Sequence, residues 1–305
     1  MKSIMQPKAD PSGLFDIRYA AFLTTVAHLR VRLHRYCTRM TGSTLDGEDI
    51  MQEALFEAYR KLDALADPAA LRPWLFTIAH NRCIDFLRSR ATRRRVETGF
   101  AEDETVLPVE PAGRGASRAI ERLVVHLPPK ERACVLLKDV FDHSLEEIAE
   151  FVGSTVGGVK SALNRGRAKL ATLPPRRASR SGPDSDPELL RLLHHYVELF
   201  NRRDWDGVRA LTSADARLQV ADCFKGRLSD SPYFVEYDKL PTTWKIAIGE
   251  IDGEVVLLAL LCHEGGWTPM HPVRVTAEAG RIDAIADYYA CPWVMSVADA
   301  TFLLS

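Results

Sequence analysis

The chain has 305 residues, of which 46% are hydrophobic and 27% charged, so it is long enough for two or three compact domains. Its longest apolar run, Val255 to Cys262, is too short for a membrane-spanning helix, and its N-terminus lacks the apolar core of a secretory signal. The six cysteines form no CxxC pair, which argues against a zinc ribbon or a disulfide framework. We therefore expect a cytoplasmic protein that does not enter a membrane.

Charge is divided unevenly along the chain, although the net formal charge is only −1. Residues 1–180 hold 29 Lys and Arg against 22 Asp and Glu, a net charge of +7. Residues 181–305 hold 11 against 19, a net charge of −8. This asymmetry predicts one part that binds a polyanion and another that does not.

A first helical domain is predicted for residues 14–95. Within it, residues 46–65 place apolar side chains on one stripe of a 3.6-residue period, with Asp46 as the expected N-cap. The opposite face carries Asp49, Gln52 and Glu53. Acidic groups in a first turn also suit the helix dipole, so this face is either solvated or binds a partner.

A second helix of this domain is predicted for residues 72–95, with Pro73 in its first turn. Asn81 lies away from the buried stripe. The helix ends in a cationic run made of Arg88, Arg90, Arg93, Arg94 and Arg95. Five arginines in eight residues exceed what the helix dipole needs, so we interpret them as phosphate contacts.

Two linkers divide the rest of the chain. Residues 96–117 are acidic and rich in Pro and Gly, and residues 174–187 form a second Pro-, Ser- and Arg-rich segment. Both compositions are typical of linkers, which leaves residues 118–173 and 188–295 as separate domains.

Residues 118–173 are predicted to form a helix-turn-helix. Ser144 and Glu147 form a capping box for a short helix, Gly153 permits the turn, and Thr155 caps the next helix. The outer face of that last helix carries Lys160, Ser161, Asn164, Arg165, Arg167 and Lys169. No acid occurs between Phe151 and Ser181, so this helix is expected to read the DNA major groove.

These three segments, in this order, resemble the extracytoplasmic-function (ECF) group of bacterial sigma factors. DGEDIMQEALFEAYRKL resembles sigma region 2.2, RPWLFTIAHNRCIDFLR resembles regions 2.3 to 2.4, and LPPKERACVLLKDVFDHSLEEIAEFVGSTVGGVKSALNRGRAKL resembles region 4. The resemblance covers about residues 14–173. It implies two all-α domains, region 2 and region 4, which are joined by the acidic linker.

The resemblance also implies partners and residue roles. In this group, region 2.2 docks on core RNA polymerase, which here points to Asp49, Gln52, Glu53 and Arg60. The loop near Asp63 to Leu71 would capture an unstacked base of the promoter −10 element. The resemblance assigns −10 DNA to Asn81, Arg88, Arg90, Arg93, Arg94 and Arg95, and −35 DNA to Lys160, Ser161, Asn164, Arg165, Arg167 and Lys169.

The last third, residues 188–295, is predicted to be a different kind of domain. Two helices are followed by strand-like segments, with turn signals at Asp252-Gly253 and Ala279-Gly280. This order resembles the SnoaL-like cone, an α+β fold. The candidate lining of a pocket in this cone is Trp267, His271, Asp287 and Tyr288. We assign no catalytic residue, metal or cofactor to it.

The predicted function is that of a sigma factor, which is not an enzyme, with core RNA polymerase and promoter DNA as partners. The charge division further predicts that the acidic C-terminal domain contacts the sigma domains and regulates them. Two alternatives stay open. One is a helix-turn-helix regulator with a ligand-sensing SnoaL-like domain, and the other is a small-molecule isomerase or cyclase fused to a DNA-binding region.

Overall fold

The computed structural model describes residues 17–65, 67–98, 126–172, 186–240, 243–263, 266–297 and 300–302. The chain forms two compact units, one over Phe22–Ser179 and the other over Arg180–Ser305 together with Met1–Ala21. Within the described ranges, no helix combines the length and the apolarity that are needed to cross a membrane. The predicted fold class, two all-α parts followed by an α+β domain, is confirmed.

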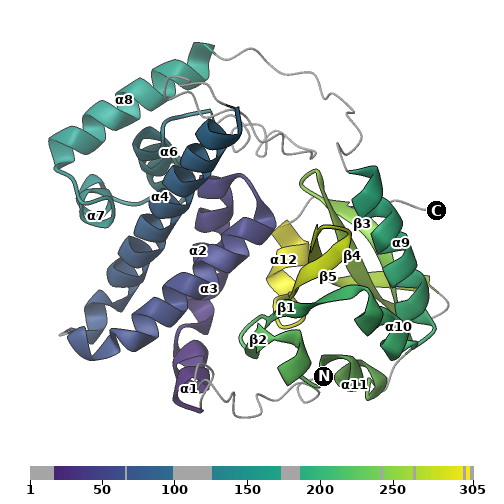
Figure 1. Cartoon of the computed structure of the whole chain (residues 1–305). Helices are drawn as coiled ribbons and strands as arrows, with labels where there is room; N and C mark the ends of the chain where they lie inside the picture. The colour runs from purple at the N-terminus through teal and green to yellow at the C-terminus, as the bar shows by residue number, and fades with distance from the viewer. Residues whose placement is uncertain are drawn as a thin grey trace. The chain divides into compact units, whose positions relative to one another are not determined.

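The first all-α part contains α2 (Ala27–Thr41), α3 (Thr44–Arg60) and α4 (Leu71–Thr98) (Figure 1). The short helix α1 (Ile17–Thr25) precedes them and crosses the boundary between the two units at Ala21. Two single 3-10 turns, η1 (Leu62–Ala64) and η2 (Pro68–Ala70), fill the loop between α3 and α4. α4 packs on α2 and α3 along one side and on α7 along another, so it lies between the two all-α parts.

The close packing of α2 on α3 depends on one glycine. A Cβ atom built on Gly47 would lie 2.5 Å from the backbone nitrogen of Thr38, closer than side chains approach backbone. α3 begins after Ser43, whose side chain accepts a hydrogen bond from the Asp46 nitrogen at 3.2 Å. The prediction that Asp46 is the N-cap is therefore wrong. Ser43 takes that place because the helix begins one turn earlier, where Gly42 has the left-handed conformation that ends α2.

The second all-α part contains α6 (Pro129–Val135), a π-helical turn η3 (Leu136–Val140), α7 (Leu145–Phe151) and α8 (Val156–Thr172). α4 continues through residues 96–98, into the segment predicted as the first linker, because no Pro or Gly interrupts it there. The remainder of that linker, the start of the second all-α part at residues 118–125, and most of the linker 174–187 lie outside the described residues.

The C-terminal unit opens with α9 (Pro187–Asn201) and α10 (Trp205–Ala210), as predicted. A seven-stranded sheet follows in the order β2-β1-β6-β5-β4-β3-β7, in which only β1 and β6 pair in parallel. Its strands are β1 (Thr212–Val220), β2 (Phe224–Arg227), β3 (Trp244–Ile251), β4 (Glu254–His263), β5 (Gly266–Glu278), β6 (Arg281–Asp287) and β7 (Ala300–Phe302). The short elements η4 (Leu228–Asp230), α11 (Tyr233–Asp238) and α12 (Pro292–Val297) complete the unit.

Both turn predictions in this unit are confirmed. Asp252 and Gly253 have φ of 53° and 86° and join β3 to β4, while Ala279 and Gly280 have φ of 50° and 73° and join β5 to β6. Two successive positive φ values match the right-handed twist of a two-residue hairpin. The hydrophobic core of this unit contains an aromatic cluster, which includes Tyr196, Phe200, Tyr233, Phe234, Tyr237 and Trp244.

Candidate nucleic-acid interface

α7 and α8 form the predicted helix-turn-helix. The Ser144–Glu147 capping box is present in both directions, at 2.9 and 3.1 Å, and Gly153 makes the turn with φ of 58°. The Thr155 hydroxyl accepts a hydrogen bond from the Gly158 nitrogen at 3.1 Å and so caps α8. These local signals fix where the second helix begins, and therefore which of its side chains face outward.

All six residues predicted to read the −35 element are exposed on α8. They are Lys160, Ser161, Asn164, Arg165, Arg167 and Lys169. The structure divides them into two groups. Lys160, Ser161 and Asn164 form the outward stripe, opposite the buried Val159, Leu163 and Gly166. Arg165, Arg167 and Lys169 flank that stripe and form ion pairs with acids of the preceding helical segment.

The acids are Glu131 on α6 and Asp139 on η3. Glu131 Oε1 accepts from Arg165 Nε at 2.9 Å, and Lys169 Nζ lies 2.9 Å from Glu131 Oε2. Asp139 accepts two hydrogen bonds from Arg167, through Nε and Nη2. Burial would raise the pKa of Glu131, but the hydrogen bonds from Arg165 and Lys169 outweigh it and lower that pKa, so Glu131 is ionised at neutral pH.

The candidate −10 residues on α4 differ in their exposure. Asn81, Arg88 and Arg93 are exposed, and Arg88 Nη1 lies 3.8 Å from Asp85 Oδ1 one turn earlier. Arg90 is half-buried, with Nη1 3.9 Å from Asp46 Oδ2 on α3. The backbone of Arg94 and Arg95 is helical, while their side chains lie outside the described part of the chain.

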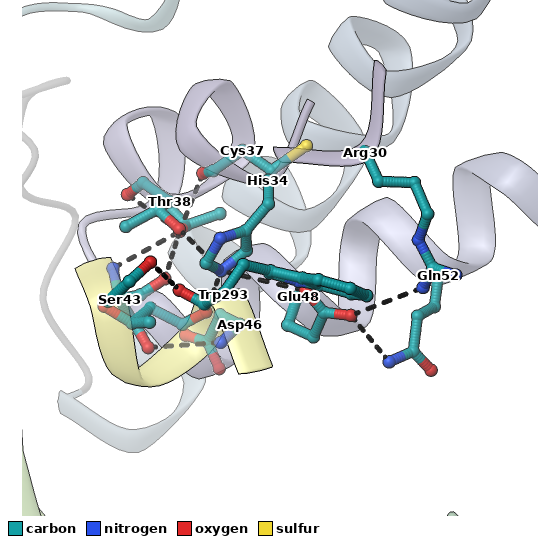
Figure 2. A network of polar contacts seen from close by, with 12 residues as sticks. Arg30, His34, Cys37, Thr38, Ser43, Asp46, Glu48, Gln52 and Trp293 are labelled. Carbon is teal, nitrogen blue, oxygen red and sulfur yellow. Dashed lines mark hydrogen bonds and ion pairs between the residues drawn. The ribbon is translucent and has the colours of Figure 1, made fainter. Parts of the chain in front are cut away.

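The residues of α3 that were predicted to bind core polymerase differ in their exposure. Glu53 and Arg60 are exposed and Asp49 is half-buried, whereas Gln52 is buried. Gln52 Nε2 donates to Glu48 Oε1 at 2.9 Å, and Glu48 also lies within 4.0 Å of Arg30 and 3.8 Å of His34 on α2 (Figure 2). Gln52 thus takes part in a buried polar network between α2 and α3, and its expected place on the exposed face is corrected.

The sequence analysis did not predict the contact that the structure shows between the two all-α parts. Arg132 on α6 is buried, and its guanidinium donates to the carbonyl oxygens of Met40 on α2 and of Leu127. Burial lowers the pKa of Arg132 to about 10, so it stays charged at neutral pH. A detectable signal did exist, because Arg132 lies on the apolar stripe that continues through Val135 and Leu136.

Aromatic side chains complete this contact. Phe76 on α4 stacks on Phe151 of α7 at 5.5 Å between ring centroids, and Tyr36 on α2 meets Phe141 edge to face at 6.1 Å. His143 is buried between Phe76 and Phe151, and Arg72 Nη2 lies 3.4 Å from its Nδ1. Burial lowers the pKa of His143, so the neutral imidazole is favoured in this contact.

The predicted pocket lining of the C-terminal domain is brought together only in part. His271 Nε2 lies 3.2 Å from Asp287 Oδ1, and both are buried. Asp287 Oδ2 accepts from the hydroxyls of Tyr233 and Tyr237 at 2.8 and 2.6 Å. Burial would raise the pKa of Asp287, but His271 and the two tyrosines lower it, so the carboxylate is ionised.

The remaining two residues of that lining have other contacts. Trp267 is 41% exposed and makes a cation–π contact with Lys245, whose Nζ lies 4.3 Å from the ring centroid. Tyr288 is buried, and its nitrogen donates to the Pro272 carbonyl at 3.2 Å. The two tyrosines on α11 that the prediction missed are four residues apart, a spacing that places them on one helix face.

Comparisons with known proteins agree with this architecture. Residues 25–93 match the family model of Sigma-70 region 2, and residues 117–170 match that of Sigma-70, region 4. The chain is 34% identical over 229 residues to the ECF RNA polymerase sigma factor SigG of Mycobacterium tuberculosis, which covers 66% of this chain and 61% of SigG. It is 31% identical over 162 residues to SigW of Bacillus subtilis, which covers 49% of this chain and 87% of SigW.

Two solved structures also show some similarity to this chain. The sigma factor SigJ of Mycobacterium tuberculosis is 21% identical with a TM-score of 0.35, over 87% of this chain and 95% of SigJ. A putative ketosteroid isomerase from Kribbella flavida is 18% identical with a TM-score of 0.27, over 33% of this chain and 76% of that one.

Regions 2 and 4, in this order on one chain, define a sigma-70-type transcription factor. Within that class, the chain belongs to the family of ECF RNA polymerase sigma factors. It spans about three fifths of the length of SigG, at 61%.

Proposed function

We propose that this protein is a dissociable specificity subunit that directs core RNA polymerase to promoters, and that it acts by binding rather than by catalysis. The observation that carries the proposal is the exposed basic face of α8 on a capped helix-turn-helix, in a chain that also has a sigma region 2. Because both partners are in the cytoplasm, the protein acts there.

Three surfaces divide this work. Asp49, Glu53 and Arg60 on α3 offer charge and hydrogen bonds to core polymerase, while Gln52 supports the helix from inside. The arginines of α4, with Asn81, track the −10 region, and α8 enters the major groove of the −35 element. Phosphate contacts position the protein on the duplex, whereas contacts with base edges select the sequence.

In vitro transcription by core polymerase and the full-length chain, on a promoter library, tests the proposal. We expect transcripts from a subset of templates that share an upstream element. Glu53→Lys should weaken polymerase binding, whereas Glu150→Lys, the same charge reversal at an exposed position of α7, should not. A helix-turn-helix repressor would instead bind duplex operator without polymerase, so failure of the chain to associate with the core enzyme refutes the proposal.

Promoter binding also requires the contact between the two all-α parts to open. The −10 and −35 elements are separated by about 25 base pairs, or about 85 Å at 3.4 Å per base pair. Two touching domains of this size reach about 55 Å. The contact through Arg132, Phe76 and Tyr36 therefore competes with simultaneous binding of both elements.

Weakening that contact should favour the open form. Phe141→Ala removes the edge-to-face pair with Tyr36 and the contact of the ring with Arg39. A pair of this kind contributes about 0.5–1.5 kcal/mol, so the apparent affinity for a two-element promoter should rise about 2- to 12-fold. Affinity for a duplex carrying the −35 element alone should not change. An equal rise on both templates would contradict the need for opening.

We further propose that the C-terminal domain regulates the sigma regions, because residues 181–305 carry a net negative charge whereas residues 1–180 of the same chain carry a net positive charge. Truncation after Arg180 should shift the ionic strength at which promoter-specific transcription is half-maximal. If the full-length and truncated chains respond alike at every salt concentration, this regulatory role is wrong.

A further inference from the structure

The basic side chains of α8 differ in how much positive charge and how many hydrogen-bond donors remain available for DNA. Glu131 is a single negative charge shared by two cations, so the group of Glu131, Arg165 and Lys169 keeps a net charge of +1. Among the described residues, Asp139 forms an ion pair with Arg167 alone, and that pair is neutral. Phosphate attraction therefore remains at Arg165 and Lys169 and is largely cancelled at Arg167.

Hydrogen-bonding capacity follows the same division. Arg165 uses only Nε toward Glu131, and the described residues offer no partner to its two terminal nitrogens. Those nitrogens form the planar edge that binds a phosphate or the O6 and N7 atoms of guanine. Arg167 instead gives Nε and Nη2 together to the Asp139 carboxylate, in a bidentate pair.

Glu131 is held in place by the packing of α6 on α8. It is 6% exposed, although Arg165 and Lys169 have side chains that are 57% and 51% exposed. A Cβ atom on Gly166 would lie 2.9 Å from Val135 and 3.5 Å from the Glu131 Cβ, so this glycine sets how closely the two helices approach. Packing therefore fixes the Glu131 carboxylate next to the exposed side chains of Arg165 and Lys169.

We propose that Glu131 is a positioning residue that holds Arg165, together with Lys169, for contact with promoter DNA, whereas Arg167 is not a promoter contact and instead clamps α8 to η3 through Asp139. The inference rests on the proposed function, because it assumes that α8 enters the −35 element. It separates two arginines that the sequence predicted to act alike. Arg165 lies next to Ser161, which belongs to the outward stripe of α8. Glu131 fixes the orientation of the two terminal guanidinium nitrogens of Arg165.

The test is in vitro transcription with core polymerase and the full-length chain, on templates randomised across the −35 element, with sequencing of the transcripts. Arg165→Ala should reduce base discrimination at one or two positions by about 5- to 150-fold. Glu131→Gln, which keeps the shape but removes the charge, should reduce discrimination at the same positions, and the double variant should lose no more than Arg165→Ala alone. Glu131→Asp should restore part of the loss.

Arg167→Ala and Asp139→Asn are the matched controls. Both should lower the melting temperature of the helical unit and leave the preferred bases unchanged. A changed base preference in Arg167→Ala, or an unchanged preference in a folded Glu131→Gln variant, overturns the inference while the proposed function stands. If the wild-type chain shows no upstream preference at all, the proposed function fails, and the inference fails with it.

Discussion

His80 makes the stability of sigma region 2 depend on pH. It is buried on α4, and its Nδ1 lies 2.8 Å from the Tyr36 hydroxyl on α2. Burial lowers the pKa of His80 from 6.5 to about 4. The unfolded chain therefore binds more protons than the folded one between these values. The stabilisation is complete above pH 6.5 and is lost progressively as the pH falls toward 4.

The magnitude follows from the two pKa values. At pH 5 the folded state loses about 2 kcal/mol relative to pH 7.5, on the scale of 1.36 kcal/mol per pKa unit. Hydrogen exchange of α2 and α4, in the full-length chain and corrected for intrinsic rates, measures the free energy of opening at both pH values. His80→Gln removes the titrating group, so its loss between pH 7.5 and pH 5 should be smaller by about 2 kcal/mol.

His143 is also held neutral by burial, so the His80→Gln variant should keep part of the pH dependence. His195→Gln, at an exposed position of α9, serves as the control for the loss of a histidine. If wild type and His80→Gln lose the same opening free energy between the two pH values, the assignment of the pH dependence to His80 is refuted.

The other predictions concern packing and the buried carboxylate. Gly47→Ala should cost about 1–3 kcal/mol and lower the melting temperature, because its Cβ would meet the Thr38 backbone, whereas Gly157→Ala, with no atom closer than 3.9 Å, should not destabilise α8. Asp287→Ala removes the carboxylate that accepts from the buried Tyr233 and Tyr237 hydroxyls and pairs with His271, and should cost the C-terminal domain about 3–5 kcal/mol in urea unfolding. Since the pKa of Asp287 is lowered, its stabilisation is present above pH 3.8 and lost only in stronger acid, so a loss already complete at pH 5 would contradict this.

Local signals were sufficient to place the helix-turn-helix and the hairpins of the sheet. The Ser144–Glu147 capping box and Gly153 define where α7 begins and ends, and the hairpins at Asp252-Gly253 and Ala279-Gly280 lie where their dipeptides predict them. Such signals involve residues within a few positions of one another, so the sequence alone contains the whole interaction. The same reasoning placed Asp46 at the N-cap wrongly, because two capping candidates lay three residues apart.

Contacts between distant segments could not be predicted in this way. Helical periodicity places Gln52 on the polar face of α3. The packing of α2 on α3 nevertheless buries its side chain, which donates to Glu48. The sequence identified Asp287 as one of four candidate pocket residues, but it did not predict that two tyrosine hydroxyls of α11 would donate to its carboxylate. In each case the burial of one side chain depends on a segment that is remote in the chain. Local sequence patterns do not predict which remote segments will pack together.

The residue types, their spacing and the division of charge therefore determined by themselves that this chain has two helical regions, a helix-turn-helix with a basic second helix, and an acidic α+β domain. Tertiary structure alone decided which of the basic residues are already neutralised. The sequence shows that Arg167 is positively charged. Whether that charge is available to DNA depends on the Asp139 carboxylate, which lies 28 residues away in the chain and is brought to Arg167 by folding.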